Sequence, residues 1–166
     1  MEHDEHISQR LRKIEELERL GVAPYAKKFE RTHTAARIIE LFDELSRSQD
    51  TKVSVAGRMK TVRRMGKASF ADVWDDSGKT QVYFKLDNLG EKNYELFKLI
   101  DIGDIIGVKG PVFKTRTGEI TVVAEELTLL TKSLLELPEK WHGLRDVEIR
   151  YRRRYLDLIA NPDVKK

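Results

Sequence analysis

The sequence contains no cysteine and only four prolines in 166 residues. Without a thiol, the chain can form neither a disulfide nor a thiolate metal site, so its fold depends on packing and hydrogen bonds. No apolar run approaches the roughly 20 residues that a membrane-spanning helix needs, and the first residues lack the basic and apolar regions of a secretory signal. We therefore expect a cytoplasmic protein that does not contact a membrane.

Signals of catalysis are also scarce. The four histidines are scattered, and no spacing among them predicts a metal site or a nucleophile with its base. Glycine-rich loops of the kinds that cradle nucleotide phosphates are missing. Asp72, Asp75 and Asp76 could bind a cation, but an acidic hairpin turn is the more common meaning of such a cluster. We expect no catalytic residue, no metal and no cofactor in this chain, which looks like a binding module.

Positive charge is concentrated in one short stretch. The whole chain carries a formal net charge of +3, but residues 52–67 contain six basic side chains and no acidic one. These are Lys52, Arg58, Lys60, Arg63, Arg64 and Lys67. A local positive field attracts polyanions such as nucleic acids, although a solvated strand face is the simpler alternative.

Three segments have the 3.6-residue periodicity of amphipathic helices. The first is Glu5–Leu20, with Leu11, Leu17 and Leu20 on the apolar stripe and Arg10 on the exposed side. The second is Thr34–Ser46, capped by Thr32 or Thr34, and the third is Asp146–Ile159. The expected buried positions of the last two helices are Ala36, Ile39, Leu41, Phe42 and Leu45, and Tyr151, Tyr155, Leu158 and Ile159.

Between these helices most segments have a periodicity of two, which predicts strands at 52–63, 68–74, 79–86, 104–114 and 119–130. At 91–100 the helical period returns and predicts a short helix. Five strands with a helix between the third and fourth are the layout of an OB-fold, whose barrel surface commonly binds oligonucleotides. The expected fold is α+β, mainly β: a five-stranded OB-fold barrel at 51–133, a helical extension at 1–50, and a linker and helix at 134–166.

Alternation places aromatic and amide side chains together on the outer face of the second and third strands. Phe70 and Trp74 share that face with Gln81 and Tyr83. Aromatic rings offer stacking platforms for unpaired bases, while an amide matches the donor and acceptor pattern of a uracil edge. Each residue alone could equally be a core or surface residue without a function.

Several motifs give the chain a family resemblance. They include Arg63-Arg64-Met65-Gly66-Lys67-Ala68-Ser69-Phe70, Lys114-Thr115-Arg116-Thr117-Gly118-Glu119, Lys140-Trp141-His142-Gly143-Leu144 and Arg154-Tyr155-Leu156-Asp157. On these residues the chain resembles the amino-terminal, anticodon-binding region of bacterial-type class II lysyl-tRNA synthetases over nearly its whole length. Aspartyl and asparaginyl relatives share the barrel and the last motif but usually lack the His-Gly-Leu portion.

The resemblance implies a role in recognising the anticodon of tRNA(Lys). It implies that Phe70 stacks on a base, that Arg64 and Gln81 hydrogen-bond to the central uridine, and that Glu119 helps to read a neighbouring uridine. The basic residues expected near the RNA backbone are Arg58, Lys60, Arg63, Lys67, Lys114 and Arg116. The full-length relative would be a homodimeric ligase that uses ATP and Mg²⁺ in a catalytic domain downstream of Lys166.

Three alternatives stay open from the sequence. The barrel could bind single strands without base preference, using the same aromatic and basic face. It could be the anticodon-binding domain of an aspartyl- or asparaginyl-tRNA synthetase. Phe70 and Trp74 could also dock a partner protein, since exposed aromatics often do so.

Overall fold

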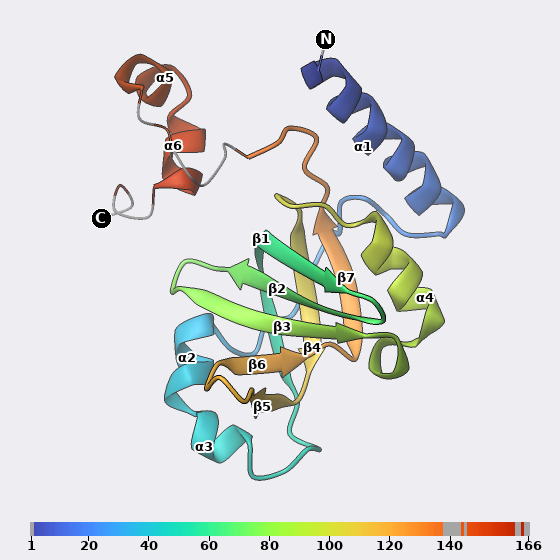
Figure 1. Ribbon diagram of the computed structural model, residues 1–166, viewed down its shortest axis with the longest axis vertical. Coiled ribbons are helices and arrows are strands. Elements are labelled where there is room, and N and C mark those ends of the chain that lie inside the picture. Colours follow the sequence, from blue (N-terminus) through green and yellow to red (C-terminus); the bar gives the residue numbers. More distant parts are fainter. Residues whose placement is uncertain (1, 138–143, 145, 162–163, 165–166) are drawn as a thin grey trace. The chain divides into compact units, whose positions relative to one another are not determined.

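The first three strands form an antiparallel meander at the predicted positions. They are β1 (Val53–Met65), β2 (Ala68–Trp74) and β3 (Lys79–Lys85). Ala71 and Val73 of β2 are buried, as are Val82 and Phe84 of β3, so the predicted inner face is confirmed. The computed structural model describes residues 2–137, 144, 146–161 and 164, in two compact units, residues 1–134 and 135–166 (Figure 1).

The predicted count of five strands is wrong, because the fourth and fifth predicted strands are each divided in two. The fourth becomes β4 (Ile105–Gly110) and β5 (Val112–Lys114). The fifth becomes β6 (Ile120–Val123) and β7 (Glu126–Thr131). Pro111 separates β4 from β5 because proline has no N–H to donate to a ladder; its carbonyl instead accepts from the Val123 N–H at 2.9 Å.

These seven strands form one mixed sheet in the order β5-β6-β3-β2-β1-β4-β7, with β3 and β6 parallel and the other pairs antiparallel. Only Pro111 joins β4 to β5 in the chain, yet four strands stand between them in the sheet order. The sheet must therefore curl strongly (Figure 1). The arrangement is an α+β OB-fold whose hydrogen-bonded order is open and has seven strands, where the sequence predicts a five-stranded barrel.

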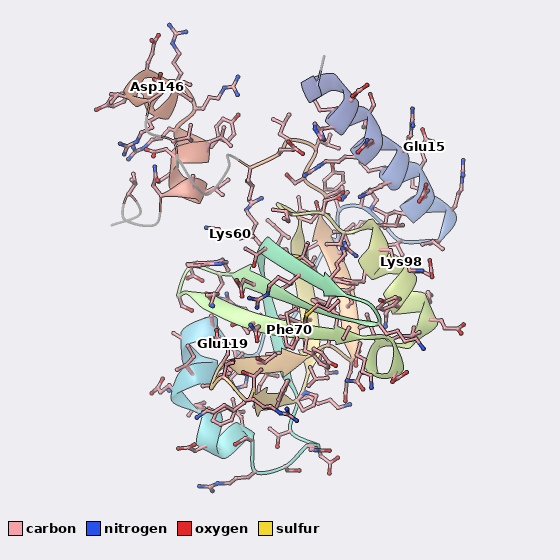
Figure 2. All side chains as sticks on the ribbon, viewed as in Figure 1. Glu15, Lys60, Phe70, Lys98, Glu119 and Asp146 are labelled. Atoms are coloured by element: carbon pink, nitrogen blue, oxygen red, sulfur yellow. The ribbon has the colours of Figure 1, made fainter. Side chains whose placement is uncertain are left out.

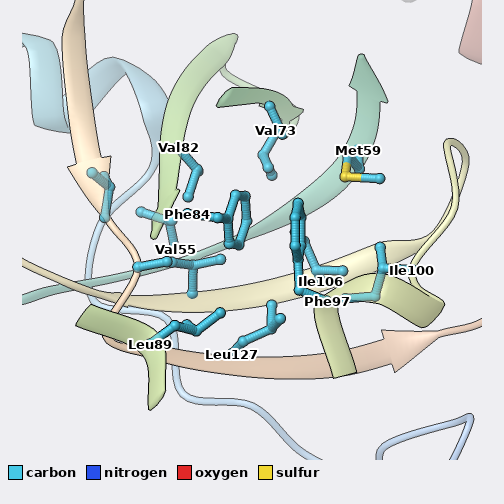
Figure 3. Close-up of a cluster of buried hydrophobic side chains, with 14 of the residues drawn as sticks. Val55, Met59, Val73, Val82, Phe84, Leu89, Phe97, Ile100, Ile106 and Leu127 are labelled. Carbon is cyan, nitrogen blue, oxygen red and sulfur yellow. The ribbon is translucent and has the colours of Figure 1, made fainter. Parts of the chain in front are cut away.

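The core lies inside this curled sheet and against α4 (Leu86–Leu99). Phe84 and Phe97 stack there with ring centres 4.2 Å apart, among residues such as Val55 and Ile106 (Figure 3). The helix begins five residues before the predicted start, and Gly90 at φ 75° kinks it. Only glycine adopts that angle without strain, so two short helical segments join at this position.

The helix α1 (Glu2–Arg19) packs through fewer apolar residues than predicted. Leu17 is fully buried, whereas Leu11 and Leu20 are exposed. Arg10, which we expected on the solvent side, is buried because its guanidinium donates to the Ser133 carbonyl at 2.7 Å and the Ile102 carbonyl at 3.0 Å. Both hydrogen bonds fasten α1 to the sheet's end.

The second predicted helix divides into α2 (Ala35–Glu40) and α3 (Phe42–Leu45). Thr34 caps α2 as predicted, its hydroxyl accepting from the Arg37 N–H at 3.3 Å. The predicted apolar stripe is partly wrong, since Ala36 and Ile39 are exposed, while those buried are Ala35, Ile38 and Leu45. A carboxylate oxygen of Asp75 accepts from the Ala35 N–H at 2.8 Å, which turns that side of α2 toward the sheet.

The described residues of 135–166 form two short helices in place of the single one predicted, α5 (Val147–Arg152) and α6 (Arg154–Ala160). Tyr151 and Tyr155, expected to be buried, are exposed in the structure. The buried residue is Asp157, whose carboxylate accepts from Arg150, Arg154 and Asn161 at 2.7–2.9 Å. Most of the predicted loop at 137–144, with the motif at 140–144, lies outside the described residues.

Within the described part of the chain, no helix is long and apolar enough to cross a membrane.

Candidate nucleic-acid interface

Two rows of cross-strand neighbours define the outer face of the sheet. In the first, Phe70 of β2 lies between Arg63 of β1 and Tyr83 of β3. In the second, Asp72 lies between Thr61 and Gln81. Because partners in register share a face, Phe70 and Gln81 project from the same surface, as predicted. We call this surface the outer face.

Aromatic rings run across the outer face in a continuous series. The ring centres of Phe70 and Tyr83 are 4.9 Å apart, and those of Tyr83 and Phe113 are 6.1 Å apart in an edge-on arrangement. These are favourable distances for aromatic pairs. Sequence reasoning missed Phe113 as a site residue; its register partner is Thr121 of β6, which in turn pairs with Gln81 of β3.

Gln81 holds a fixed orientation on this face. Its side chain is largely buried, and its Oε1 accepts from the hydroxyl of Thr121 in β6 at 2.9 Å. Within the described part of the chain, the amide nitrogen of Gln81 has no hydrogen-bond partner. A buried amide that is held by one atom is arranged in advance to donate through the other.

Glu119 lies at the edge of the same face, at the start of β6 (Figure 2). Its N–H donates to the Thr115 hydroxyl at 3.0 Å, so the turn fixes its position. One carboxylate oxygen is 3.0 Å from the ammonium of Lys79, and this hydrogen bond raises the pKa of Lys79 above its ordinary value. The pair leaves the second oxygen of Glu119 to accept from a ligand.

Arg64 does not join the other three predicted site residues. Its register partner is Ser69, which is buried on the inner side of β2. The guanidinium lies 4.9 Å from the ring centre of Phe97 and donates to the Ile100 carbonyl at 3.4 Å. The structure therefore gathers Phe70, Gln81 and Glu119, and it places Arg63 beside Phe70 instead of Arg64.

The six basic residues expected near an RNA backbone fall into different settings. Lys67 and Arg116 are exposed in turns, whereas Lys60 lies 4.7 Å above the ring of Trp74 and Lys114 5.1 Å from the ring of Phe42. Arg58 donates to the Gly103 carbonyl at 2.7 Å, and burial lowers the pKa of its guanidinium. Arg58 therefore hydrogen-bonds within the protein, whereas the exposed basic side chains can contact phosphates.

The carboxylates of the acidic hairpin serve the turn. One oxygen of Asp75 accepts from the N–H groups of Ser77 and Gly78 at 2.8 and 3.0 Å, and the other accepts from Ala35. These bonds help to hold the pKa of Asp75 below its ordinary value although burial opposes them. Among the described residues, no cluster of three metal-ligating side chains is present.

Comparisons with known proteins agree with this geometry. Residues 53–130 match the family model of the OB-fold nucleic acid binding domain. The chain is 55% identical over 160 residues to a lysine–tRNA ligase of Moorella thermoacetica, and 54% identical over 163 residues to one of Pelotomaculum thermopropionicum. These alignments cover 96% and 98% of the chain. In both cases the chain spans 32% of the length of the relative.

Proposed function

We propose that the outer face recognises the anticodon of tRNA(Lys), starting from the match of residues 53–130 to the OB-fold nucleic acid binding domain family. The similarity to lysine–tRNA ligases extends over almost the whole chain, which supports this RNA over other single strands. Phe70 stacks on one unpaired base, and Gln81 and Glu119 read the edges of uridines next to it.

The observation that carries the proposal is the fixed amide of Gln81 beside an aromatic platform. Thr121 holds Oε1, so the amide N–H groups donate to a carbonyl oxygen of the bound base. Uracil offers such an oxygen at O4 and O2. In the neighbouring uridine, the N3–H donates to the second carboxylate oxygen of Glu119. Stacking alone gives affinity without choosing a base, whereas this pair of groups selects uridine.

The surrounding charges favour an RNA strand over an uncharged ligand. Arg63 lies beside Phe70, and the exposed cations Lys67 and Arg116 lie in turns of the same sheet. Lysine and arginine side chains near a single strand neutralise its phosphates and release counterions. In this proposal Arg63 takes the place at the base-binding row that the sequence had given to Arg64.

For the longer protein, we propose a lysine–tRNA ligase, the name that the relatives carry. It would make lysyl-adenylate from ATP with Mg²⁺ and then charge tRNA(Lys). Its catalytic residues would lie outside this chain, and the ligase would act as a homodimer. Residues 1–50 would be a helical extension, 51–133 the anticodon-binding domain, and 134–166 the connection to the catalytic domain.

The test compares anticodon stem-loops that differ only in the triplet. Titrating the 166-residue chain with a UUU loop and an AAA loop at one salt concentration gives the two dissociation constants. We expect the UUU loop to bind at least tenfold more tightly, since mismatched hydrogen bonds leave buried polar groups unpaired. Equal affinities would indicate a general single-strand binding domain. A protein-docking surface would instead bind a partner protein with an affinity that neither salt nor added RNA changes.

A further inference from the structure

The outer face continues past Gln81 to Trp74, which the proposed reading of the triplet does not use. Trp74 follows Phe70 by four residues in β2, and its register partners are Arg58 and Lys79. Four residues of a strand span about 13 Å, so no single base reaches both rings. Trp74 therefore lies one step further along the same surface than Gln81, on the side of Lys79 and Glu119.

Two polar atoms at this end of the face lack hydrogen-bond partners. Among the described residues, the indole Nε1 of Trp74 and Oδ1 of Asp72 are the buried side-chain atoms without one. The other oxygen of Asp72 accepts from the Thr61 hydroxyl at 2.7 Å, and Oδ1 forms an ion pair with the Lys79 ammonium at 3.7 Å, which is longer than a hydrogen bond. Buried polar groups are almost always hydrogen-bonded, so a donor and an acceptor without hydrogen bonds in one strand require an explanation.

A bulge brings a cation to the same place. The register of β1 and β2 shifts between Met59 and Thr61, and the extra residue is Lys60. Its ammonium lies 4.7 Å from the ring centre of Trp74. An aromatic ring with a cation beside it suits a nucleotide, because a base stacks on the ring and a phosphate attracts the ammonium.

We propose that Trp74, Lys60 and Asp72 form a further nucleotide subsite for the residue that flanks the triplet. Its base stacks on the Trp74 ring and the Lys60 ammonium contacts its phosphate. Nε1 of Trp74 donates to an oxygen of the nucleotide, and Oδ1 of Asp72 accepts from an N–H of the base. The subsite rests on the proposed function, because it extends the same RNA strand along the outer face.

The experiment uses the fluorescence of Trp74 in the 166-residue chain with Trp141→Phe, which leaves Trp74 as the single tryptophan. The probes are the UUU stem-loop and two versions with an abasic nucleotide immediately before or after the triplet. We expect the intact loop to quench Trp74, and one of the two abasic loops to bind about 5- to 100-fold more weakly without quenching. Unchanged fluorescence, or equal binding of all three loops, would overturn the subsite.

Variants at position 74 supply the matched controls. Trp74→Phe keeps a stacking ring without the N–H, and Trp74→Leu removes the ring. We expect Trp74→Leu to bind the intact loop as weakly as the parent binds the abasic loop, with Trp74→Phe between them. Circular dichroism checks folding, and the fluorescence of the Trp141→Phe chain tests the proposal even if Trp74→Leu unfolds.

Phe70→Ala separates failure of the subsite from failure of the proposed function. If Phe70→Ala weakens binding of the UUU loop while Trp74→Leu does not, the outer face reads the triplet and the subsite is wrong. If Phe70→Ala folds and leaves binding unchanged, the proposed function itself is wrong.

Discussion

The side chains of Arg63 and Arg64 show how one extra residue exchanges the faces of a strand. Unbroken alternation from buried Val53 and Val55 would put Arg64 outside, next to Phe70. The bulge after Met59 inserts Lys60, so Val62 and Arg64 face inward and Arg63 faces outward. The sequence contains the alternation but no signal for the bulge, which explains why the face of Phe70 was predictable and that of the arginines was not.

The two arginines should therefore respond differently to substitution. We expect Arg63→Ala to weaken binding of the UUU stem-loop several-fold and to reduce the salt dependence by about one phosphate contact. We expect Arg64→Ala to lower the free energy of unfolding by about 0.5 to 1 kcal/mol, through the lost contact with Phe97, and to change RNA affinity less. Titration at several salt concentrations and urea denaturation measure both effects. The reverse ranking of the two affinities would mean that Arg64 is the RNA-contacting residue.

Gln81 depends on a neighbour that has no access to RNA. We expect Gln81→Ala and Phe70→Ala each to weaken binding of the UUU stem-loop by about 1 to 3 kcal/mol while the chain stays folded. Thr121→Val removes the hydroxyl that holds Oε1, so it should reduce the preference for UUU over AAA while Gln81 is still present. Affinity measurements with both loops and a circular dichroism spectrum test this. Unfolding of both alanine variants would instead identify Gln81 and Phe70 as core residues.

At the scale of elements, alternation along the sequence predicted where strands form, but contacts between distant segments determined which side of a helix is buried. The strands at 68–74 and 79–85 were predictable because apolar side chains alternate cleanly there. The apolar stripe of α2 was not, since a hydrogen bond from a hairpin forty residues away sets which side faces the sheet. Of the two predicted strands that divide, only the fourth contains a signal for its division, which is Pro111 between β4 and β5.

The junction of β4 and β5 tolerates no side chain, which gives a prediction for this element. A Cβ on Gly110 would lie 1.8 Å from the Val123 carbonyl oxygen, a backbone atom that cannot move away alone. We expect Gly110→Ala to lower the free energy of unfolding by about 3 kcal/mol or more. Gly118→Ala is the control, because that position has a φ of +88° but open space, and should cost about 1 kcal/mol. Equal losses in urea denaturation would exclude a special role for the close approach.

Across the first unit, a group of charges ties distant segments together. The ammonium of Lys132, at the end of β7, is fully buried and bonds to Asp104 at 2.6 Å and Asp101 at 2.7 Å. Lys13 of α1 bonds to the other oxygen of Asp101. Helix α1 and the segments that follow α4 and β7 thus share one ionic cluster, which is buried at Lys132 and Asp104. Neither the hydrophobic periodicity nor the charge pattern of the sequence predicts this cluster, because its members are up to 119 residues apart (Lys13 to Lys132).

The cluster predicts a specific dependence of stability on pH. Burial would raise the pKa of Asp101, but hydrogen bonds from Lys13 and Lys132 outweigh it and hold the pKa below its ordinary value of 3.8. A carboxyl whose pKa is lower in the folded state stabilises the fold at pH values above 3.8, and this contribution disappears as the pH falls through the folded pKa.

We therefore expect Asp101→Asn to lower the free energy of unfolding by about 1 to 2 kcal/mol at pH 7, and by progressively less below pH 3.8, where the parent loses the same contribution. Urea denaturation at both ends of this range measures the difference, and hydrogen exchange should show α1 opening first, because Lys13 loses its partner. Glu95→Gln is the matched control, since its pair with Lys98 is exposed and should contribute little. A loss for Asp101→Asn that is the same at pH 7 and in acid would show that the pairing of its charge does not hold α1 to the sheet.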